Sequence, residues 1–471
     1  MNLQKNNSLS IINTLPNEYL NNMKELLSKS DFELLIKSYD EPSHQGIIIN
    51  KNKINTNLID KFTADFDLIN IDKYTYEIRN KEYLLKNEKI GKNVFHHIGS
   101  FYVSEPSALR VIPKLDIKED DIVLDLCAAP GGKSIQALMY LDEKKGGMLY
   151  ANEIISSRCK ILSSNLERVG FSNVVILNSD AKTLSSKFNN YFDKIIIDAP
   201  CSGEGMFRKY PYAIDEWSLS NVNMCAKRQK EIVSDAISML KDGGMFSYST
   251  CTFEVKEDEE IRDYILQNKN LSLVYEEKIF PFMNKGEGQY IAVFKKSGSA
   301  CSDRNVNKFV FKNNISSILS KYKNIYLDFE KAYLRKSLLS ENKYLLLVND
   351  NLYLSNKIAL ELDDDILYKN GILLGSINKN VFIPSHALSH YIESENFLNK
   401  IEFSNDINNV EKYLKGLEIT INKNEFTNNN TLINGYVLVC YNNLCIGLGK
   451  LSIKEDKLII KNHYPKGLRN L

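Results

Sequence analysis

VLDLCAAPGGKS, residues 123–134, is the stretch that decides the fold. It begins as an apolar strand, passes through small Ala and Gly residues, and then starts a helix. A turn of this composition lets the backbone approach a ligand closely. The triplet GKS at its end is similar to the end of a phosphate-binding loop, but that loop requires glycine where Cys127 stands. A nucleotide-phosphate loop is therefore disfavoured, and the turn is expected to hold another ligand.

Strand and helix candidates alternate on both sides of this turn, through residues 96–296. The strand candidates are DIVLDLC, GGMLYAN, NVVILNSD, FDKIIIDAP and MFSYSTCT, and the helix candidates start at Ser134 or run through CKILSSNLERVG and KRQKEIVSDAISMLKDGG. Such βαβ alternation predicts an α/β fold with a parallel sheet, helices on both faces, and a ligand crevice at the carboxyl ends of the strands.

The rest of the chain divides into further regions. In residues 1–95, the stretch 17–38 has one apolar helical face and IIINKNKIN predicts a strand, which together indicate a small α/β module. Residues 297–307 have the composition of a linker. Residues 308–392 mix helix and strand patterns and stay unclassified, whereas 393–471 end in three β-rich runs and predict a small β-rich domain.

Composition excludes several classes of protein. The 471 residues carry 60 basic and 59 acidic side chains, so a polyanion has to be met by a local basic patch. No stretch has the length and apolarity of a signal peptide or membrane span, and eight scattered cysteines exclude a disulfide scaffold, so we expect a soluble cytoplasmic protein. The histidine pairs at 96–97 and 386/390 have no acidic or cysteine partner at ligand spacing, and no metal site is predicted.

Acidic residues end three successive strand candidates. Glu153 follows the second strand 22 residues after Gly131, close to the position where an acid binds a cofactor ribose. Asp180 ends the third strand and Asp198 the fourth. Each alone is compatible with a helix N-cap or a surface acid, but together they predict one ligand crevice.

Two cysteines also follow strand candidates directly. Cys201 comes after IIIDAP and Cys251 after MFSYST, so both are expected at the same edge of the sheet. The other six are interpreted as small hydrophobic residues. Nearby Arg208, Lys209 and Lys227 favour thiolates, and hence nucleophiles, at Cys201 and Cys251.

Six segments share a family resemblance: FYVSEPSA (101–108), LDLCAAPGGKS (124–134), DAPCSGEGMFRK (198–209), AKRQKEI (226–232), YSTCTF (248–253) and NHYPKGLR (462–469). Together they resemble the Sun-type (Nop/Sun, Fmu) RNA cytosine-5 methyltransferases, specifically the bacterial small-subunit rRNA branch with a C-terminal RNA-binding extension. Two positions depart from the family pattern, Ser104 where Gln is common and Tyr210 where an acidic residue is common.

The resemblance implies a Rossmann-like class I methyltransferase core at 96–296, RNA contact by the module 1–95, and a PUA-like RNA-binding domain at 393–471. It implies S-adenosylmethionine as cofactor, with its ribose on Glu153 and its adenine beside Asp180. The cofactor-binding set is Cys127, Ala128, Ala129, Pro130, Gly131, Gly132, Lys133, Glu153, Arg158, Asp180 and Asp198.

The resemblance also implies catalytic roles. Cys251 would attack C6 of cytosine, Cys201 would assist release, and Asp198 would hold the base edge. Lys133 would stabilise Asp198 or the cofactor carboxylate, or else be a solvated lysine at a helix start. The substrate would be 16S rRNA, bound by a monomer.

The predicted RNA contacts come from two places in the chain. Phe207 is expected at the mouth of the base pocket or in the core. The basic residues expected to bind RNA are Arg208, Lys209, Lys461, Lys466 and Arg469, with His463 beside the last three; a solvated tail is the alternative for those at the C-terminus.

Two other functions are compatible with parts of this sequence. An N-methyltransferase acting on an exocyclic amine would share the cofactor half but needs no cysteine, so the cysteine pair argues against it. A non-catalytic RNA-binding or ribosome-assembly factor would be expected to lose Cys251 or the acidic cofactor residues, and all are present.

Overall fold

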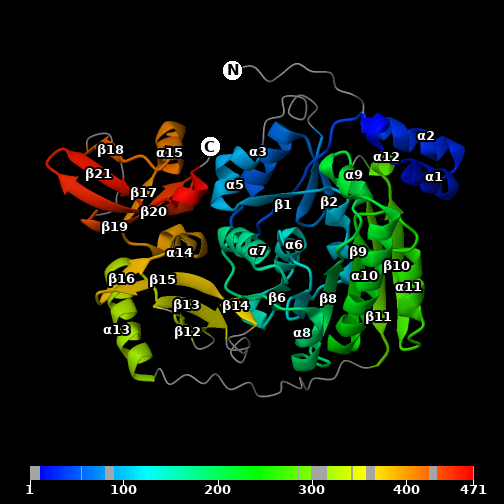
Figure 1. The fold of residues 1–471 in the computed structure, drawn as a ribbon. Helices are drawn as coiled ribbons and strands as arrows, with labels where there is room; N and C mark the ends of the chain where they lie inside the picture. The colour runs from blue at the N-terminus through cyan, green and yellow to red at the C-terminus, as the bar shows by residue number, and fades with distance from the viewer. Residues whose placement is uncertain are drawn as a thin grey trace.

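The computed structural model describes ten stretches of the chain (Figure 1), namely residues 11–54, 56–79, 90–284, 286–298, 316–340, 343–348, 350–356, 366–404, 406–423 and 432–469. Of the predicted linker 297–307, only the first two residues are described, so most of that prediction lies outside the described residues.

An eight-stranded sheet occupies the centre of the molecule, in the order β10-β11-β9-β8-β5-β6-β7-β14. The five middle strands are parallel, as predicted, while the three edge strands pair antiparallel. The strand order reverses between β5 and β8. In sheets of this kind the ligand crevice lies at that point, at the carboxyl ends of the strands. The strands are β5 (Ile122–Asp125), β6 (Met148–Asn152), β7 (Val174–Leu177), β8 (Phe192–Asp198), β9 (Leu240–Thr250), β10 (Leu271–Ile279), β11 (Gln289–Lys296) and β14 (Leu367–Asn370).

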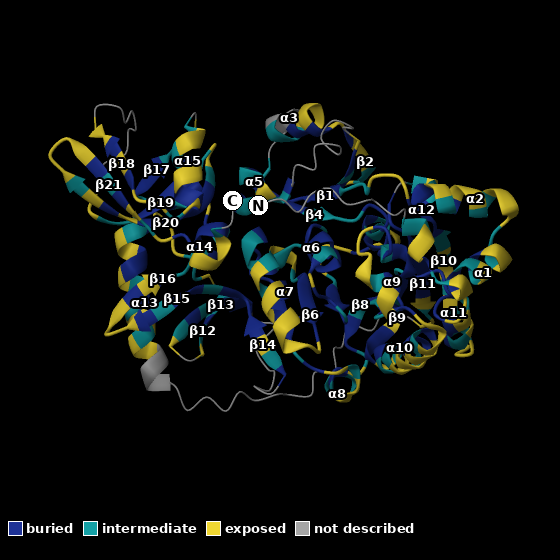
Figure 2. Cartoon of the chain, turned by 45° about the horizontal axis from the view of Figure 1, so that its top comes forward, coloured by how far each residue is buried: buried dark blue, intermediate teal, exposed yellow. Residues whose placement is uncertain are grey.

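Helices cover both faces of this sheet, because its middle strands are apolar on both sides. Ile122 and Leu124 point into one core with α8 (Ala181–Lys187), α10 (Leu219–Met239) and α11 (Glu259–Leu266). Val123 points into the other, with α6 (Gly132–Leu138) and α7 (Ser156–Val169). The strands are accordingly buried in Figure 2.

The N-terminal module contains a four-stranded antiparallel sheet in the order β2-β3-β1-β4. The single helix expected over residues 17–38 is wrong: it is two helices, because Ser28 caps a new one by accepting a hydrogen bond from the Asp31 N–H at 3.2 Å. The strand expected in IIINKNKIN is confirmed. The elements are α1 (Asn17–Leu26), α2 (Lys29–Ser38), β1 (Gly46–Ile49), α3 (Thr56–Phe66), β2 (Leu68–Asp72), β3 (Thr75–Ile78), α5 (Val94–Ile98) and β4 (Phe101–Ser104).

The region left unclassified by sequence contains a second antiparallel sheet, β12-β13-β15-β16, between two helices. These elements are α13 (Ser316–Tyr333), β12 (Lys343–Val348), β13 (Asn351–Asn356), β15 (Ile372–Asn378), β16 (Val381–Pro384) and α14 (His386–Tyr391). Between β13 and β15, the chain inserts β14 into the edge of the central sheet beside β7.

The β-rich C-terminal domain is confirmed as a five-stranded sheet in the order β17-β19-β20-β21-β18. Its elements are β17 (Lys400–Glu402), α15 (Ile407–Leu414), β18 (Ile419–Asn422), β19 (Gly435–Tyr441), β20 (Leu444–Lys454) and β21 (Lys457–Asn462). No helix in the described stretches is long and apolar enough to cross a membrane. The residue boundaries of the predicted domains stay a prediction.

Candidate active site

The turn after β5 is held in place by side chains from neighbouring elements. Asn152, at the end of β6, donates to the carbonyls of Leu126 and Ser179, both at 3.0 Å. Asn165, on α7, donates to the Pro130 carbonyl at 2.8 Å. The turn therefore brings together the predicted cofactor residues Cys127 to Lys133 on a rigid backbone, with few bulky side chains of its own.

Glycine is required where this turn enters α6. Gly131 has φ +117°, a conformation that other residues rarely adopt. A Cβ on Gly132 would lie 3.3 Å from the Ser104 hydroxyl and 3.6 Å from the ring of Tyr102, both from β4. Strand β4 therefore lies directly beside the turn.

Asp125, the last residue of β5, is a candidate that sequence reasoning missed. One carboxylate oxygen accepts a hydrogen bond from Ser134 at 2.6 Å, while the other is buried and has no hydrogen-bond partner among the described residues. Burial raises the pKa of Asp125 to about 7. A buried polar atom usually has a partner, so this oxygen fits a cationic ligand group such as the ammonium of S-adenosylmethionine. The sequence signal that could have identified Asp125 is its place at the end of an apolar strand, which it shares with Glu153, Asp180 and Asp198.

Glu153 and Arg158 meet at the same crevice. Glu153 is 2% exposed, and its carboxylate accepts from the Ile155 N–H at 3.0 Å and pairs with Arg158 at 3.2 Å. Arg158 also donates to the Ala129 carbonyl at 2.8 Å. The arginine thus joins the acid to the turn, which keeps the Glu153 carboxylate in a fixed place.

Asp180 acts as a helix cap in this structure. Its carboxylate accepts from the N–H and the hydroxyl of Thr183, both at 2.8 Å, and these bonds lower the pKa of Asp180. The N-cap role that the sequence left open is therefore present. The neighbouring Ser179 is bonded to Asn152, so the cap lies at the same sheet edge as the turn.

The two predicted cysteines are in contact. Cys201 follows β8, Cys251 follows β9, and their sulfur atoms lie 3.2 Å apart. The Cys251 thiol and burial raise the pKa of Cys201. Arg208, one of the basic residues expected to favour a thiolate at Cys201, is paired with Glu287 instead, so that part of the expectation is wrong. A thiolate at Cys201 stays a prediction.

Asp198 and Lys133 form an ion pair beside the cysteines, with nitrogen and oxygen 2.8 Å apart. Ser249 donates to the other Asp198 oxygen at 2.8 Å, and Gln289 donates to it at 3.3 Å. The Lys133 side chain is 9% exposed, which excludes the alternative of a solvated lysine.

Two residues predicted near the RNA are structural. The prediction that Arg208 binds RNA is wrong. Arg208 is buried, pairs with Glu287 at 3.0 Å, and donates to the Ser38 and Gly286 carbonyls at 3.1 and 2.8 Å. It therefore joins α2 to the loop after Cys201 and does not face solvent. Phe207 is fully buried and packs edge-on against Tyr19, so the core role holds.

The remaining basic candidates lie at the surface to different degrees. Lys209 is exposed, with its ammonium 5.5 Å from the ring centre of Tyr210. Lys461 and Lys466 are exposed as well. Arg469 is half-buried and donates to the Tyr464 carbonyl at 2.8 Å, so part of its guanidinium is already bonded.

The described residues hold no group of three or more His, Cys, Asp and Glu that could bind a metal ion. His386 and His390 do touch, with ring nitrogens 3.1 Å apart, and burial lowers the pKa of both, to about 3 for His386.

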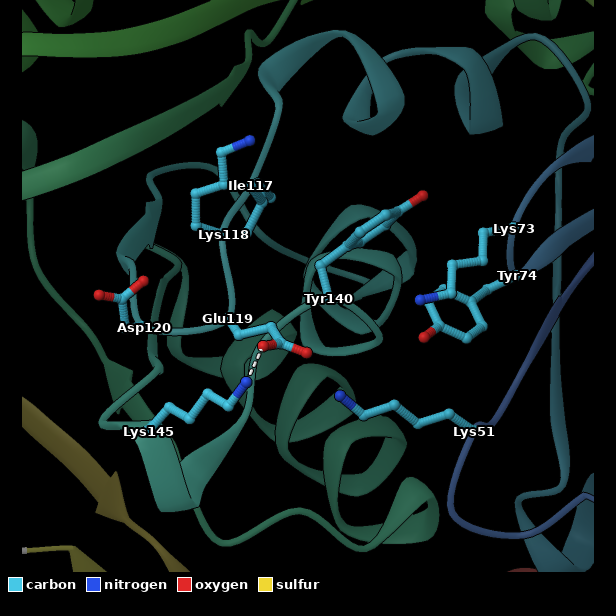
Figure 3. A pocket seen from close by; sticks show the side chains of 9 residues that line it. All are labelled: Lys51, Lys73, Tyr74, Ile117, Lys118, Glu119, Asp120, Tyr140 and Lys145. Atoms are coloured by element: carbon cyan, nitrogen blue, oxygen red, sulfur yellow. Dashed lines mark hydrogen bonds and ion pairs between the residues drawn. The ribbon is translucent and has the colours of Figure 1, made fainter.

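A separate cavity of about 860 Å³ lies between the N-terminal module and the central sheet (Figure 3). It is lined by Lys51, Lys73, Tyr74, Ile117, Lys118, Glu119, Asp120, Tyr140 and Lys145. Residues 117–120 precede β5 and Lys145 precedes β6, so the cavity lies near the amino ends of the strands. It is therefore distinct from the crevice with the cysteines.

Comparison with known proteins gives a family and a fold. At the sequence level, Ribosomal RNA small subunit methyltransferase F of Vibrio vulnificus is 29% identical over 405 residues, covering 80% of this chain and 81% of that protein. The protein of the same name from Pectobacterium carotovorum is 32% identical over 254 residues. This second match covers 52% of this chain and 52% of the Pectobacterium protein, so this chain spans about half the length of that relative.

Solved structures share the fold. A methyltransferase homologue from Pyrococcus horikoshii has a TM-score of 0.52 at 23% identity, covering 62% of this chain and all of that one. NSun6 from the same organism, solved with SFG, has a TM-score of 0.51 at 19% identity, covering 60% of this chain and 99% of that one.

Three protein-family models match in order along the chain. The N-terminal domain of 16S rRNA methyltransferase RsmF matches residues 15–106, 16S rRNA methyltransferase RsmB/F matches 112–296, and the methyltransferase RsmF PUA domain matches 400–470. The chain therefore belongs to the 16S rRNA methyltransferase RsmB/F family.

Proposed function

We propose that this chain transfers a methyl group from S-adenosylmethionine to C5 of a cytosine in RNA. The observation that carries the proposal is the 3.2 Å contact between Cys201 and Cys251 beside the ion pair of Asp198 and Lys133. Cytosine C5 is a poor nucleophile, and addition of a thiolate to C6 is a way to activate it. Methylation of an exocyclic amine would use neither sulfur atom.

Small-subunit rRNA is the substrate we propose. The relatives carry that substrate in their names, and the PUA match at 400–470 gives the chain a further RNA-binding domain. We assign RNA phosphate contacts to Lys209, Lys461 and Lys466, which are exposed, and a partial one to Arg469. The enzyme would act as a cytoplasmic monomer. Its successive domains would end at residues 95, 296, 307 and 392.

The cofactor residues would surround S-adenosylmethionine from three strand tips. The turn from Cys127 to Lys133 would contact its methionine end, Asp125 its ammonium, Glu153 the ribose hydroxyls, and the Asp180 region the adenine. When bound, the cofactor supplies an electrophilic methyl group on a sulfonium. Arg158 would act indirectly here, since it fixes Glu153 against the turn.

Cys251 would begin the reaction as a thiolate. Its sulfur forms a bond to C6, and the electrons of the C5–C6 double bond move to C5, which then takes the methyl group. Asp198 would hold the N3/N4 edge of the base, and the Lys133 ion pair would keep that carboxylate in place.

Cys201 would complete the reaction. Its sulfur lies 3.2 Å from that of Cys251, so it would be within reach of a base bonded to Cys251. Cys201 then loses its proton to solvent and takes the proton from C5. The electrons of the C5–H bond restore the double bond, and Cys251 leaves as a thiolate.

The test uses Cys201→Ala with S-adenosylmethionine and rRNA from cells that lack the enzyme, analysed on a denaturing gel. We expect a covalent RNA–protein adduct that disappears in the Cys201→Ala, Cys251→Ala double variant. If wild type methylates the RNA but Cys201→Ala gives no adduct, the release role of Cys201 is wrong or the acceptor atom is not C5. Methylation of an exocyclic amine would then be the better function.

A further inference from the structure

The backbone on both sides of Cys201 is bound by two buried side chains that the proposed reaction does not use. Gln229, on α10, donates one hydrogen bond to the Pro200 carbonyl at 2.9 Å. Glu257, in the loop between Cys251 and α11, accepts a hydrogen bond from the Ser202 N–H at 3.1 Å. Both side chains are fully buried.

Gln229 and Glu257 also bond to each other. The Gln229 amide donates to the same Glu257 oxygen at 2.8 Å. Gln229 and Glu257 therefore form a continuous hydrogen-bonded bracket around Cys201, from the Pro200 carbonyl to the Ser202 N–H. The bracket joins three separate elements: the loop after β8, helix α10, and the loop after β9. A shift of any one of them would move the sulfur of Cys201 relative to that of Cys251.

A second bond links the two cysteine loops next to the sulfur atoms. The hydroxyls of Ser202 and Thr252, the residues directly after each cysteine, lie 2.8 Å apart and are buried. Glu257 therefore holds the same residue, Ser202, that contacts the Cys251 loop. These hydrogen bonds hold the two cysteine loops together beside the sulfur atoms, which lie 3.2 Å apart.

We propose that Glu257 is a positioning residue which, together with Gln229, keeps Cys201 where it can take the C5 proton while Cys251 is bonded to C6. The proposal rests on the proposed function. It predicts a selective defect, because Cys251 reaches C6 without the bracket, whereas proton removal needs Cys201 in the correct place. Misplacement of a reacting group by about 1 Å costs about 10²-fold in rate.

The experiment compares Glu257→Ala, Gln229→Ala and Glu257→Gln in turnover assays and on the denaturing gel with rRNA and methyl-labelled S-adenosylmethionine. For the two alanine variants we expect kcat to fall about 10–100-fold, an unchanged KM for S-adenosylmethionine, and a labelled RNA–protein adduct that wild type does not accumulate. Glu257→Gln retains an oxygen that can accept the hydrogen bonds from the Ser202 N–H and the Gln229 amide. This variant should therefore release the methylated RNA and accumulate much less adduct than Glu257→Ala.

Glu330→Ala is a matched control for loss of a buried carboxylate. Glu330, on α13, is 4% exposed and accepts a hydrogen bond from the Leu338 N–H at 2.9 Å, so it also holds a loop, but away from the cysteines. Its removal should lower the thermal midpoint of unfolding without producing an adduct.

The outcomes separate this proposal from the proposed function. If Cys201→Ala accumulates the adduct but Glu257→Ala and Gln229→Ala lose turnover without it, the bracket is only structural and the positioning role is wrong. The role is also wrong if Glu257→Gln accumulates as much adduct as Glu257→Ala, because hydrogen-bond geometry would then not matter. If Cys201→Ala itself forms no adduct, it is the covalent function that fails.

Discussion

Cys251 has the most demanding role proposed for a single residue, because it alone would form the bond to C6. We expect Cys251→Ala to reduce methyl transfer by at least about 10³-fold, as removal of a nucleophile does in other covalent enzymes. Cofactor affinity should stay at the wild-type value, since the side chains that bond to the turn are Asn152, Arg158 and Asn165. Transfer of labelled methyl groups into rRNA and titration calorimetry with S-adenosylmethionine measure the two quantities.

Glu153 is the residue proposed to bind the ribose of the cofactor. A hydrogen bond to a charged group contributes about 1.5–3 kcal/mol, so Glu153→Ala should weaken S-adenosylmethionine binding by about 10–100-fold. The loss also releases Arg158 from its 3.2 Å ion pair, which adds to the effect on the turn. Calorimetry on the variant measures the affinity, with Cys251→Ala as the control that keeps it. Equal affinity for wild type and Glu153→Ala would remove the ribose role.

At the scale of an element, the segment after the short helix η6 (Glu204–Met206) presents exposed aromatic rings close to the crevice. Tyr210 and Tyr212 are 40% and 60% exposed, with ring centres 5.5 Å apart and Lys209 next to them. The Gly205 N–H donates to the Cys251 carbonyl at 2.8 Å, so η6 lies beside Cys251 and this segment follows it directly. Rings and a cation together suit single-stranded RNA.

We therefore expect Tyr210→Ala and Tyr212→Ala to weaken RNA binding by about 1–3 kcal/mol each, the usual contribution of one stacked base. Tyr210→Phe keeps the ring and should retain affinity, which makes it the matched control. Filter binding with an unmodified rRNA fragment measures the effect. Equal affinities for Tyr210→Ala and Tyr210→Phe would mean that no base stacks there.

The elements show which parts of the site sequence can predict. Cys201, Cys251, Asp198 and Glu153 were predictable because each directly follows an apolar strand, and the tips of parallel strands meet at one edge. Arg208 was predicted wrongly because its partner Glu287 lies far along the chain, and sequence proximity to Cys201 could not reveal that ion pair.

Other features left no local pattern. Strand β14 adds to the central sheet from a region with mixed signals, and its place is decided by pairing with β7 and not by its own residues. The bracket of Gln229 and Glu257 was invisible for the same reason, since its members come from separate elements.

On the scale of the whole molecule, the two ends of the chain share one hydrophobic core. Phe62, Phe95 and Phe101 of the N-terminal part pack in the same cluster as Val439 and Tyr464 of the C-terminal sheet. Figure 1 shows α5 beside that sheet and α14 between the sheet and α7. The proposed RNA-binding C-terminal domain is therefore anchored to the catalytic domain through the N-terminal module and α14.

Gly170 tests this anchoring. It ends α7 with φ +76°, and a Cβ there would lie 2.1 Å from the His390 carbonyl oxygen of α14. Gly203 has nearly the same φ, +78°, but no atom within 4 Å of an added Cβ, so Gly203→Ala measures backbone strain alone, about 1–2 kcal/mol. Gly170→Ala should cost about 1–3 kcal/mol more, because α14 has to move away from α7. Chemical denaturation compares the two variants, and limited proteolysis should cut Gly170→Ala faster between the catalytic and C-terminal parts. Equal stability losses would show that α14 is not held tightly against α7, and the C-terminal domain would then reach RNA as a loosely tethered unit.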